Sequence, residues 1–229
     1  MSTRTADEVK QHHENFMGEE LGSLYHALWN EVAWLYSIWS EYVELFGTKP
    51  SRIELANQAA GFFFRVVQDS LWEGSLLHLA RLTDPSQTSG KENLTIRRLP
   101  ILIDDDKVRE EVEELVKFAA IKSEFCRDWR NRRIAHRDLG LAIGKEKANP
   151  LKPASREKVK KALDAISDVL NAVSKHYLDS ETMFETRGTR NGVLSLLYVL
   201  DDGLRVEDER HARLKSGDYS VQDYQPRDL

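Results

Sequence analysis

Long stretches in which an apolar residue recurs at every third or fourth position constrain the fold of this chain most strongly. The first stretch runs from Glu19 to Phe46, and Gly47 and Pro50 follow it, as expected where a helix ends. Its apolar positions are Leu21, Leu24, Tyr25, Leu28, Val32, Leu35, Tyr36, Trp39, Val43 and Phe46. This spacing predicts a long amphipathic helix.

Further helices are predicted over residues 51–83, 104–136, 155–179 and 188–214. The stretch 51–83 has the widest apolar surface, so we expect it to be the central core helix, with Gly61 and Gly74 allowing close helix approach. Only six prolines and twelve glycines occur in 229 residues, which favours helices. We therefore expect an all-α fold: an antiparallel helical bundle with a C-terminal helical extension.

The predicted boundaries give a flexible N-terminus over residues 1–18, a bundle over 19–180, and a helical extension with a polar tail over 181–229. The single cysteine, Cys126, excludes an internal disulfide and fits a reducing cytosol. The polar N-terminus lacks the apolar core of a signal peptide, and the apolar run Val193 to Leu200 is too short to span a bilayer. These features indicate a cytoplasmic protein without a membrane partner.

The charge is unevenly distributed along the predicted helix 104–136. Residues 122–137 carry six Lys or Arg against two acids, whereas residues 104–114 carry seven acids against two bases. Because the formal net charge is −5, nucleic-acid binding requires a local basic patch of this kind. The same polarity also complements the helix dipole, so a purely structural explanation stands beside the functional one.

The sharpest chemical signal is the segment Arg130-Asn131-Arg132-Arg133-Ile134-Ala135-His136. Histidine exchanges protons near neutral pH, and arginine grips a phosphate through two hydrogen bonds. RNA supplies its own nucleophile, the 2′-OH beside each phosphate. A site with both side chains can therefore break RNA without a metal, since histidine moves protons and arginine offsets the charge that develops on the phosphate.

This segment resembles the R-x(4–6)-H signature of HEPN proteins (higher eukaryotes and prokaryotes nucleotide-binding), many of which are metal-independent ribonucleases. Together with LWEGSLLHLARLTDP, from Leu71 to Pro85, it resembles the abortive-infection type over roughly residues 20–180. The resemblance implies a HEPN-like bundle with Arg130 on phosphate, Asn131 positioning and His136 as acid or base. It further implies RNA or a nucleotide as partner, a homodimer, a cognate antitoxin, no cofactor, and a toxin or phage-defence role.

Other charged residues near the motif complete the predicted site. Arg132, Arg133 and Arg137 are predicted to bind RNA. Glu73 and Asp69 lie one helical turn apart and are predicted to support the Arg/His site, with a solvated row of salt bridges as the alternative. The sequence shows no zinc-ligand spacing, so we expect no metal.

The spacing of the motif leaves the catalytic arginine open. On an unbroken helix Arg132 and His136 share a face, whereas Arg130 points about 120° away from His136. A catalytic Arg130 therefore requires the helix to bend or end near Arg133, or a partner subunit to complete the site, as HEPN dimers commonly do. Two alternatives to a nuclease stay open: a non-catalytic RNA- or nucleotide-binding module, and a structural helical dimer.

Overall fold

A computed structural model of the chain describes residues 5–185 and 191–219. They form two compact units, the first from residues 5–39 and 70–185, the second from residues 40–69 and 191–219. The domain boundaries predicted from the sequence stay a prediction, although the second unit also includes residues 40–69. The parts of the predicted terminus, extension and tail over residues 1–4, 186–190 and 220–229 lie outside the described residues.

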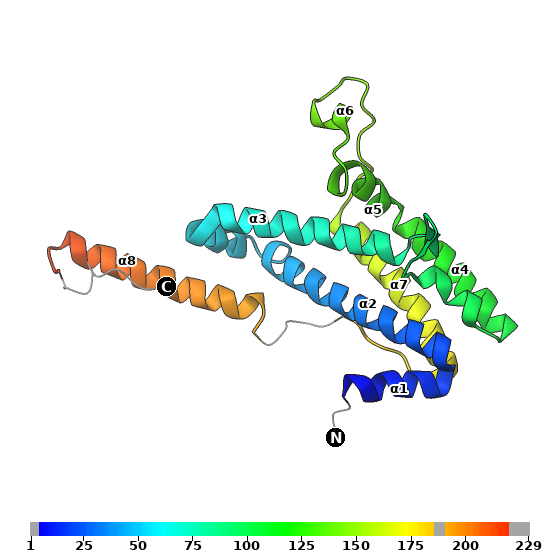
Figure 1. Cartoon of the computed structure of the whole chain (residues 1–229). Helices are drawn as coiled ribbons and strands as arrows, with labels where there is room; N and C mark the ends of the chain where they lie inside the picture. The colour runs from blue at the N-terminus through cyan, green and yellow to red at the C-terminus, as the bar shows by residue number, and fades with distance from the viewer. Residues whose placement is uncertain (1–4, 186–190, 220–229) are drawn as a thin grey trace. The chain divides into compact units, whose positions relative to one another are not determined.

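The predicted all-α fold is confirmed (Figure 1). The α-helices are α1 (Ala6–Met17), α2 (Glu19–Phe46), α3 (Pro50–Leu82), α4 (Asp106–Lys122), α5 (Glu124–Trp129), α6 (Leu139–Ala142), α7 (Arg156–Leu178) and α8 (Val193–Lys215). Two 3₁₀ turns, η1 (Ile96–Arg98) and η2 (Pro100–Leu102), and a π-helical turn, η3 (Arg130–Ile134), join them. None of the described helices is long and apolar enough to cross a membrane.

The core of the first unit is built from helices α2, α3, α4 and α7. Helix α7 packs along α4 and runs antiparallel to it, as the ribbon shows (Figure 1). Burying one leucine or isoleucine side chain in this core stabilises the fold by about 1.5–3 kcal/mol. The largest fully buried side chains of α2, α3 and α7 are Tyr25, Leu28, Leu35, Leu76, Leu79, Leu82, Leu163, Ile166 and Leu170.

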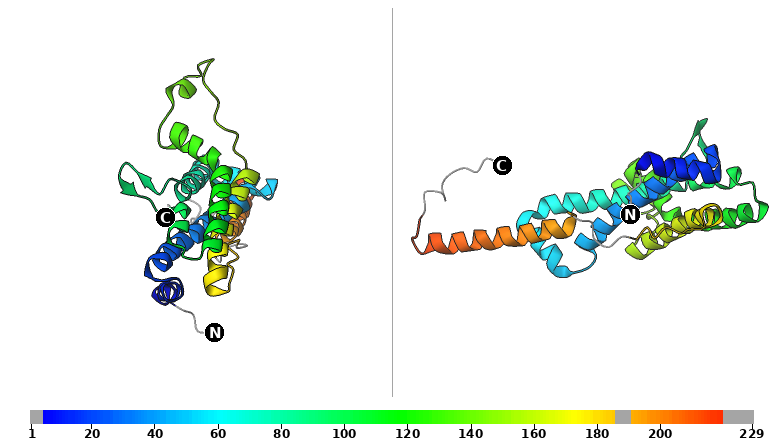
Figure 2. Two further views of the ribbon diagram at one scale, coloured as in Figure 1. Left: turned by 90° about the vertical axis from the view of Figure 1, so that its right-hand side faces the viewer. Right: turned by 90° about the horizontal axis from the view of Figure 1, so that it is seen from below.

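A two-stranded hairpin projects from the first unit where the sequence predicted only a loop (Figure 2, left). Its strands are β1 (Gln87–Thr88) and β2 (Lys91–Glu92), which pair antiparallel. Ser89 (φ 51°) and Gly90 (φ 76°) between them both adopt left-handed conformations. Two successive residues of this kind form the two-residue turn whose twist suits a hairpin.

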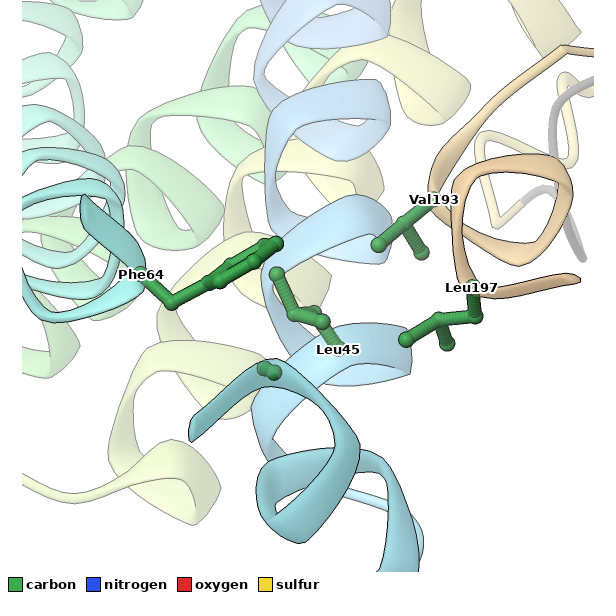
Figure 3. Close-up of a cluster of buried hydrophobic side chains, with 5 residues drawn as sticks. Leu45, Phe64, Val193 and Leu197 are labelled. Atoms are coloured by element: carbon green, nitrogen blue, oxygen red, sulfur yellow. The ribbon is translucent and has the colours of Figure 1, made fainter. Parts of the chain in front are cut away.

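The second unit has its own small core, drawn in Figure 3. Glu41 accepts a hydrogen bond from the Val193 backbone N–H at 2.6 Å and so caps the first turn of α8. The core side chains are Leu45, Ala56, Phe64, Val193 and Leu197. Phe64 is buried, but its neighbour Phe62 is 86% exposed, because α3 bends at Ala60, whose backbone leaves the helical conformation. The prediction that all of 51–83 forms a core helix is therefore wrong for this part.

Helices α1 and α2 approach each other closely at Gly22. A Cβ atom there would lie 2.5 Å from the Glu14 Cα, so only glycine fits. Ser23 donates a hydrogen bond to Glu14 at 2.6 Å beside this contact. At Gly61 and Gly74, the predicted close-approach sites, a Cβ atom would meet no other helix among the described residues. Helix α1 thus packs on α2 in the region that the sequence analysis assigned to a flexible terminus.

Replacement of Gly22 by alanine should lower the free energy of unfolding by about 1–3 kcal/mol, because the added methyl group forces two backbones apart. Gly74→Ala is the matched control: its Cβ meets open space, so removing a glycine from a helix should stabilise by about 0.5–1 kcal/mol. Urea unfolding followed by circular dichroism checks both. Equal effects of the two substitutions would contradict the close contact.

The stability of the α1–α2 contact should also depend on pH. Burial, followed by the nearby His26 and His12, lowers the pKa of His13 from 6.5 to about 4. The unfolded chain therefore takes up this proton as the pH falls through about 6.5, while the folded chain does not until about 4. Stability from neutral His13 should be lost over that interval, so the urea midpoint of His13→Leu should fall less on acidification than that of the wild type. An equal fall would refute this.

Candidate functional site

The motif lies on a broken helix rather than on the single helix predicted over 104–136. Helix α4 ends at the buried Ser123, α5 follows, and the π-helical turn η3 begins at Arg130. In this turn the Ala135 N–H donates to the Arg130 carbonyl five residues back, at 2.8 Å. Such wide turns hold one extra residue and occur frequently at functional sites.

This turn changes the geometric argument about Arg130 and His136. The hydrogen bond between Arg130 and Ala135 closes one turn, and the helix ends at Ile134. The angle of about 120° expected for an unbroken α-helix therefore does not apply. One of the two conditions set for a catalytic Arg130, that the helix bend or end near Arg133, is met within a single chain.

Arg130 is held by two neighbours. Its Nη1 pairs with Asp84 Oδ2, and its Nε donates to Asn131 Oδ1 at 3.0 Å. The side chains of Arg130 and Asp84 are 23% and 15% exposed. Asn131 thus accepts a hydrogen bond from the arginine, and its positioning role stays a prediction.

Sequence analysis missed Asp84, which follows the end of α3. Thr95, fully buried, fixes this corner by donating to the carbonyls of Leu82 and Asp84 at 2.9 and 2.8 Å. The only signal in the sequence is that Asp84 lies within the segment LWEGSLLHLARLTDP, one residue before its end. No local pattern indicates that it pairs with Arg130, 46 residues away.

Arg132 has a different environment, because four protein oxygens accept hydrogen bonds from its guanidinium group. Its partners are Asp128 Oδ1 (3.4 Å), Asp138 Oδ2 (3.4 Å), the Pro150 carbonyl (3.3 Å) and the Asn149 carbonyl. A backbone hydrogen bond from Leu141, together with Arg132, holds the pKa of Asp138 below its usual value. Arg132 therefore joins the motif turn to the loop that carries α6.

Two further hydrogen bonds fix the far end of this loop, residues 139–152. Asp128 Oδ2 accepts the Lys152 backbone N–H at 2.8 Å, and Trp129 Nε1 donates to the Lys152 carbonyl at 2.9 Å. The ring of Trp129 also lies edge-on to Trp72 of α3, with centroids 6.3 Å apart. Both ends of the α6 loop are thus tied to the motif helix, beyond which the loop projects (Figure 1).

The two predicted supporting carboxylates have different partners. Glu73 accepts a hydrogen bond from Arg133 Nε at 2.9 Å, and the Arg133 guanidinium also lies 5.6 Å from the centre of the Trp129 ring. Asp69 belongs to the second unit and pairs with Arg65 of its own helix at 3.1 Å, both side chains being exposed. This pair matches the alternative of a solvated salt bridge.

His136 and Arg137 form the open part of the motif. Both are exposed, and within residues 5–185 and 191–219 neither side chain makes a hydrogen bond or an ion pair. They lie between the end of the π-helical turn and Asp138, which caps α6 through the Leu141 N–H. The described residues contain no group of three His, Cys, Asp or Glu side chains arranged to hold a metal ion.

Arg132→Ala should release the α6 loop, because two carboxylates and two carbonyls lose their donor. We expect the free energy of unfolding to fall by about 2 kcal/mol and limited proteolysis within residues 139–152 to become faster. Arg137→Ala, which removes a side chain without a partner in residues 5–185 and 191–219, should change stability by less than about 0.5 kcal/mol. If both variants resist protease as the wild type does, Arg132 does not hold the loop.

Comparison with known proteins places the chain in a family. The family model HEPN_AbiU2, described as AbiU2, matches residues 18–192, which is more than half of the chain and includes every element of the site. No curated protein and no solved structure matches this chain. The chain therefore belongs to the HEPN_AbiU2 family, an abortive-infection family of HEPN proteins.

Proposed function

We propose that this protein is a metal-independent endoribonuclease that acts in phage defence by abortive infection. The observation that carries the proposal is the motif turn itself. It combines an arginine oriented by Asp84 and Asn131 with an exposed histidine that has no partner among the described residues. An oriented positive charge and a free proton carrier are the two requirements of RNA cleavage by an internal hydroxyl.

In the proposed reaction His136 accepts the proton of a ribose 2′-OH. The 2′-oxygen attacks the adjacent phosphorus, and the bond from phosphorus to the 5′-oxygen breaks. The leaving 5′-oxygen takes a proton from solvent and becomes a hydroxyl, while the phosphate ends as a 2′,3′-cyclic ester. Arg130 offsets the negative charge on the phosphate oxygens during the attack.

The geometry suggests how the arginines divide these tasks. Arg130 keeps Nη2 without a hydrogen-bond partner among the described residues, so it can contact phosphate while Asp84 holds it. Arg137 is exposed and suited to contact a second phosphate, and Arg133 is shared between Glu73 and RNA. Arg132 acts mainly in holding the α6 loop, because protein oxygens take up its donors.

A homodimer and a cognate antitoxin are part of this proposal and rest on the family alone. The motif turn removes the geometric need for a partner subunit, since the helix ends within one chain. A dimer would still bring two His136 side chains to one RNA, which suits a reaction that both takes up and returns a proton.

A second candidate function is RNA or nucleotide binding without cleavage. The ion pair between Arg130 and Asp84 favours it, because a carboxylate occupies a donor that a phosphate would otherwise use. Such a protein would bind RNA through Arg137 and Arg133 and leave it intact.

The test is cleavage of assorted RNAs by the purified protein in the presence of EDTA. We expect cleavage that EDTA does not abolish, reduced by roughly 10²-fold or more in His136→Ala. Arg130→Ala should also remove most of the activity and keep the helical circular dichroism signal. His211→Ala, at an exposed histidine on α8, is the matched control and should cleave normally.

Activity that EDTA removes and that persists in His136→Ala would overturn the ribonuclease proposal. RNA binding without cleavage by the wild type would favour the second candidate. Loss of activity in Arg132→Ala with folding intact, and none in Arg130→Ala, would reverse the assignment of the two arginines.

A further inference from the structure

Three arginines from separate parts of the first unit converge on the corner Thr83-Asp84, directly after α3. Arg97 Nε and Arg127 Nη2 both donate to the Thr83 carbonyl, at 2.9 and 3.1 Å. Arg130 pairs with the Asp84 carboxylate. Arg97 comes from η1, Arg127 from α5 and Arg130 from the motif turn, so folding brings together side chains that the sequence keeps apart.

This corner has more positive than negative charge. Asp84 contributes one negative charge, and the C-terminus of a helix such as α3 contributes about half of one. The three guanidinium groups therefore exceed the negative charge of Asp84 and this helix end together by about 1.5. Asp84 also forms an ion pair with Arg127, whose Nε is 3.7 Å from Asp84 Oδ1, but this distance is too long for a hydrogen bond. Both atoms are buried, and neither has a hydrogen-bond partner among the described residues.

Neighbouring arginines show what an ordinary surface pair looks like in this protein. Arg98, next to Arg97 in η1, pairs with Glu92 at 2.9 Å, and Arg133 pairs with Glu73 at the same distance. Each of those cations has a carboxylate of its own. Capping of the α3 carboxyl end explains one arginine on the Thr83 carbonyl, but not a second on the same oxygen and a third on Asp84.

Several donors of the corner are also unused. Arg97 forms its hydrogen bond through Nε, which leaves both terminal nitrogens, while Arg127 keeps Nη1 and Arg130 keeps Nη2 without hydrogen-bond partners in the described part of the chain. The side chains of Arg127 and Arg130 are 28% and 23% exposed, and Arg97 is half-buried. Partly buried guanidinium groups with free N–H donors match the oxygens of a phosphate.

We infer that Arg97, Arg127 and Arg130 form a phosphate-binding subsite, which the R-x(4–6)-H motif alone does not contain. The inference deepens the proposed ribonuclease function: the ligand is a backbone phosphodiester of the RNA, next to the bond that is cut. Arg130 belongs to both sites, so a phosphate in the corner lies beside the nucleotide whose 2′-OH gives its proton to His136. Free inorganic phosphate offers the same chemistry and is the alternative source.

The experiment compares Arg97→Ala with Arg98→Ala, neighbouring arginines of which only the first belongs to the corner. Binding of 2′-O-methyl RNA, which lacks the attacking hydroxyl, is measured against salt concentration for both variants and the wild type. We expect Arg97→Ala to reduce the slope of log K against log salt by about 0.7, the value for one lost phosphate contact on a single strand. Arg98→Ala should leave the slope nearly unchanged, because Glu92 already neutralises it.

A second arm measures thermal unfolding with inorganic phosphate and with chloride at equal ionic strength. The same measurement shows whether Arg97→Ala is folded. If it is not, Arg97→Lys replaces it in this arm, because lysine keeps the positive charge but lacks the planar guanidinium group that binds a phosphate through two hydrogen bonds. Phosphate should raise the melting temperature of the wild type and of Arg98→Ala more than that of the Arg97 variant. This arm needs no RNA, so it tests the subsite even if the protein binds none and the proposed function fails.

Equal salt slopes and equal phosphate effects for the Arg97 and Arg98 variants would overturn the subsite while leaving the ribonuclease proposal intact. An Arg97-dependent phosphate effect without a change in RNA slope would support a phosphate site but assign it to free phosphate. Changes in both arms that depend on Arg97 support the RNA subsite.

Discussion

The ion pair between Arg130 and Asp84 connects the motif to the rest of the first unit. It joins the π-helical turn to the end of α3, and the buried Thr95 holds that end through two carbonyl oxygens. Both side chains are only partly exposed, so removing one partner leaves the charge of the other partly desolvated and without its counter-charge. The orientation of Arg130 therefore depends on a residue outside the motif, and the proposed chemistry depends on that orientation.

Two neighbouring arginines of the motif thus have separate roles in this account. Arg130 is partly exposed, oriented and left with a free donor, as a group that stabilises charge on a phosphate requires. Arg132 is surrounded by protein oxygens and fixes the loop after His136. The π-helical turn makes this division possible, because the extra residue in the turn changes the angular relation of the two side chains to His136.

The parts of the fold that local periodicity determines could be predicted from the sequence. Helix α2 spans Glu19–Phe46 as predicted, and Ser155 caps α7 by accepting the Lys158 N–H. Features that depend on distant partners could not be predicted. The apolar spacing of α3 continues through Phe62, although the bend at Ala60 leaves that side chain in solvent. Gly22 is indistinguishable in the sequence from Gly74, because only the approach of α1 makes a side chain impossible there.

In the candidate site, too, the features carried by local sequence could be predicted and those that depend on distant partners could not. The motif residues were identified from their chemistry and the family resemblance, and their catalytic roles stay predictions. The role of Asp84 and the convergence of Arg97 and Arg127 on its corner could not be predicted, since these groups meet only when η1, α5 and the end of α3 come together.

In the proposed reaction the nucleophile is the 2′-hydroxyl of the RNA itself, and this is the central claim. Mass spectrometry of the product ends, from a reaction run in EDTA, tests it most directly. The account predicts a 2′,3′-cyclic phosphate on one fragment and a 5′-hydroxyl on the other. A 3′-hydroxyl paired with a 5′-phosphate would contradict it, because those ends require water rather than the 2′-oxygen to attack the phosphorus.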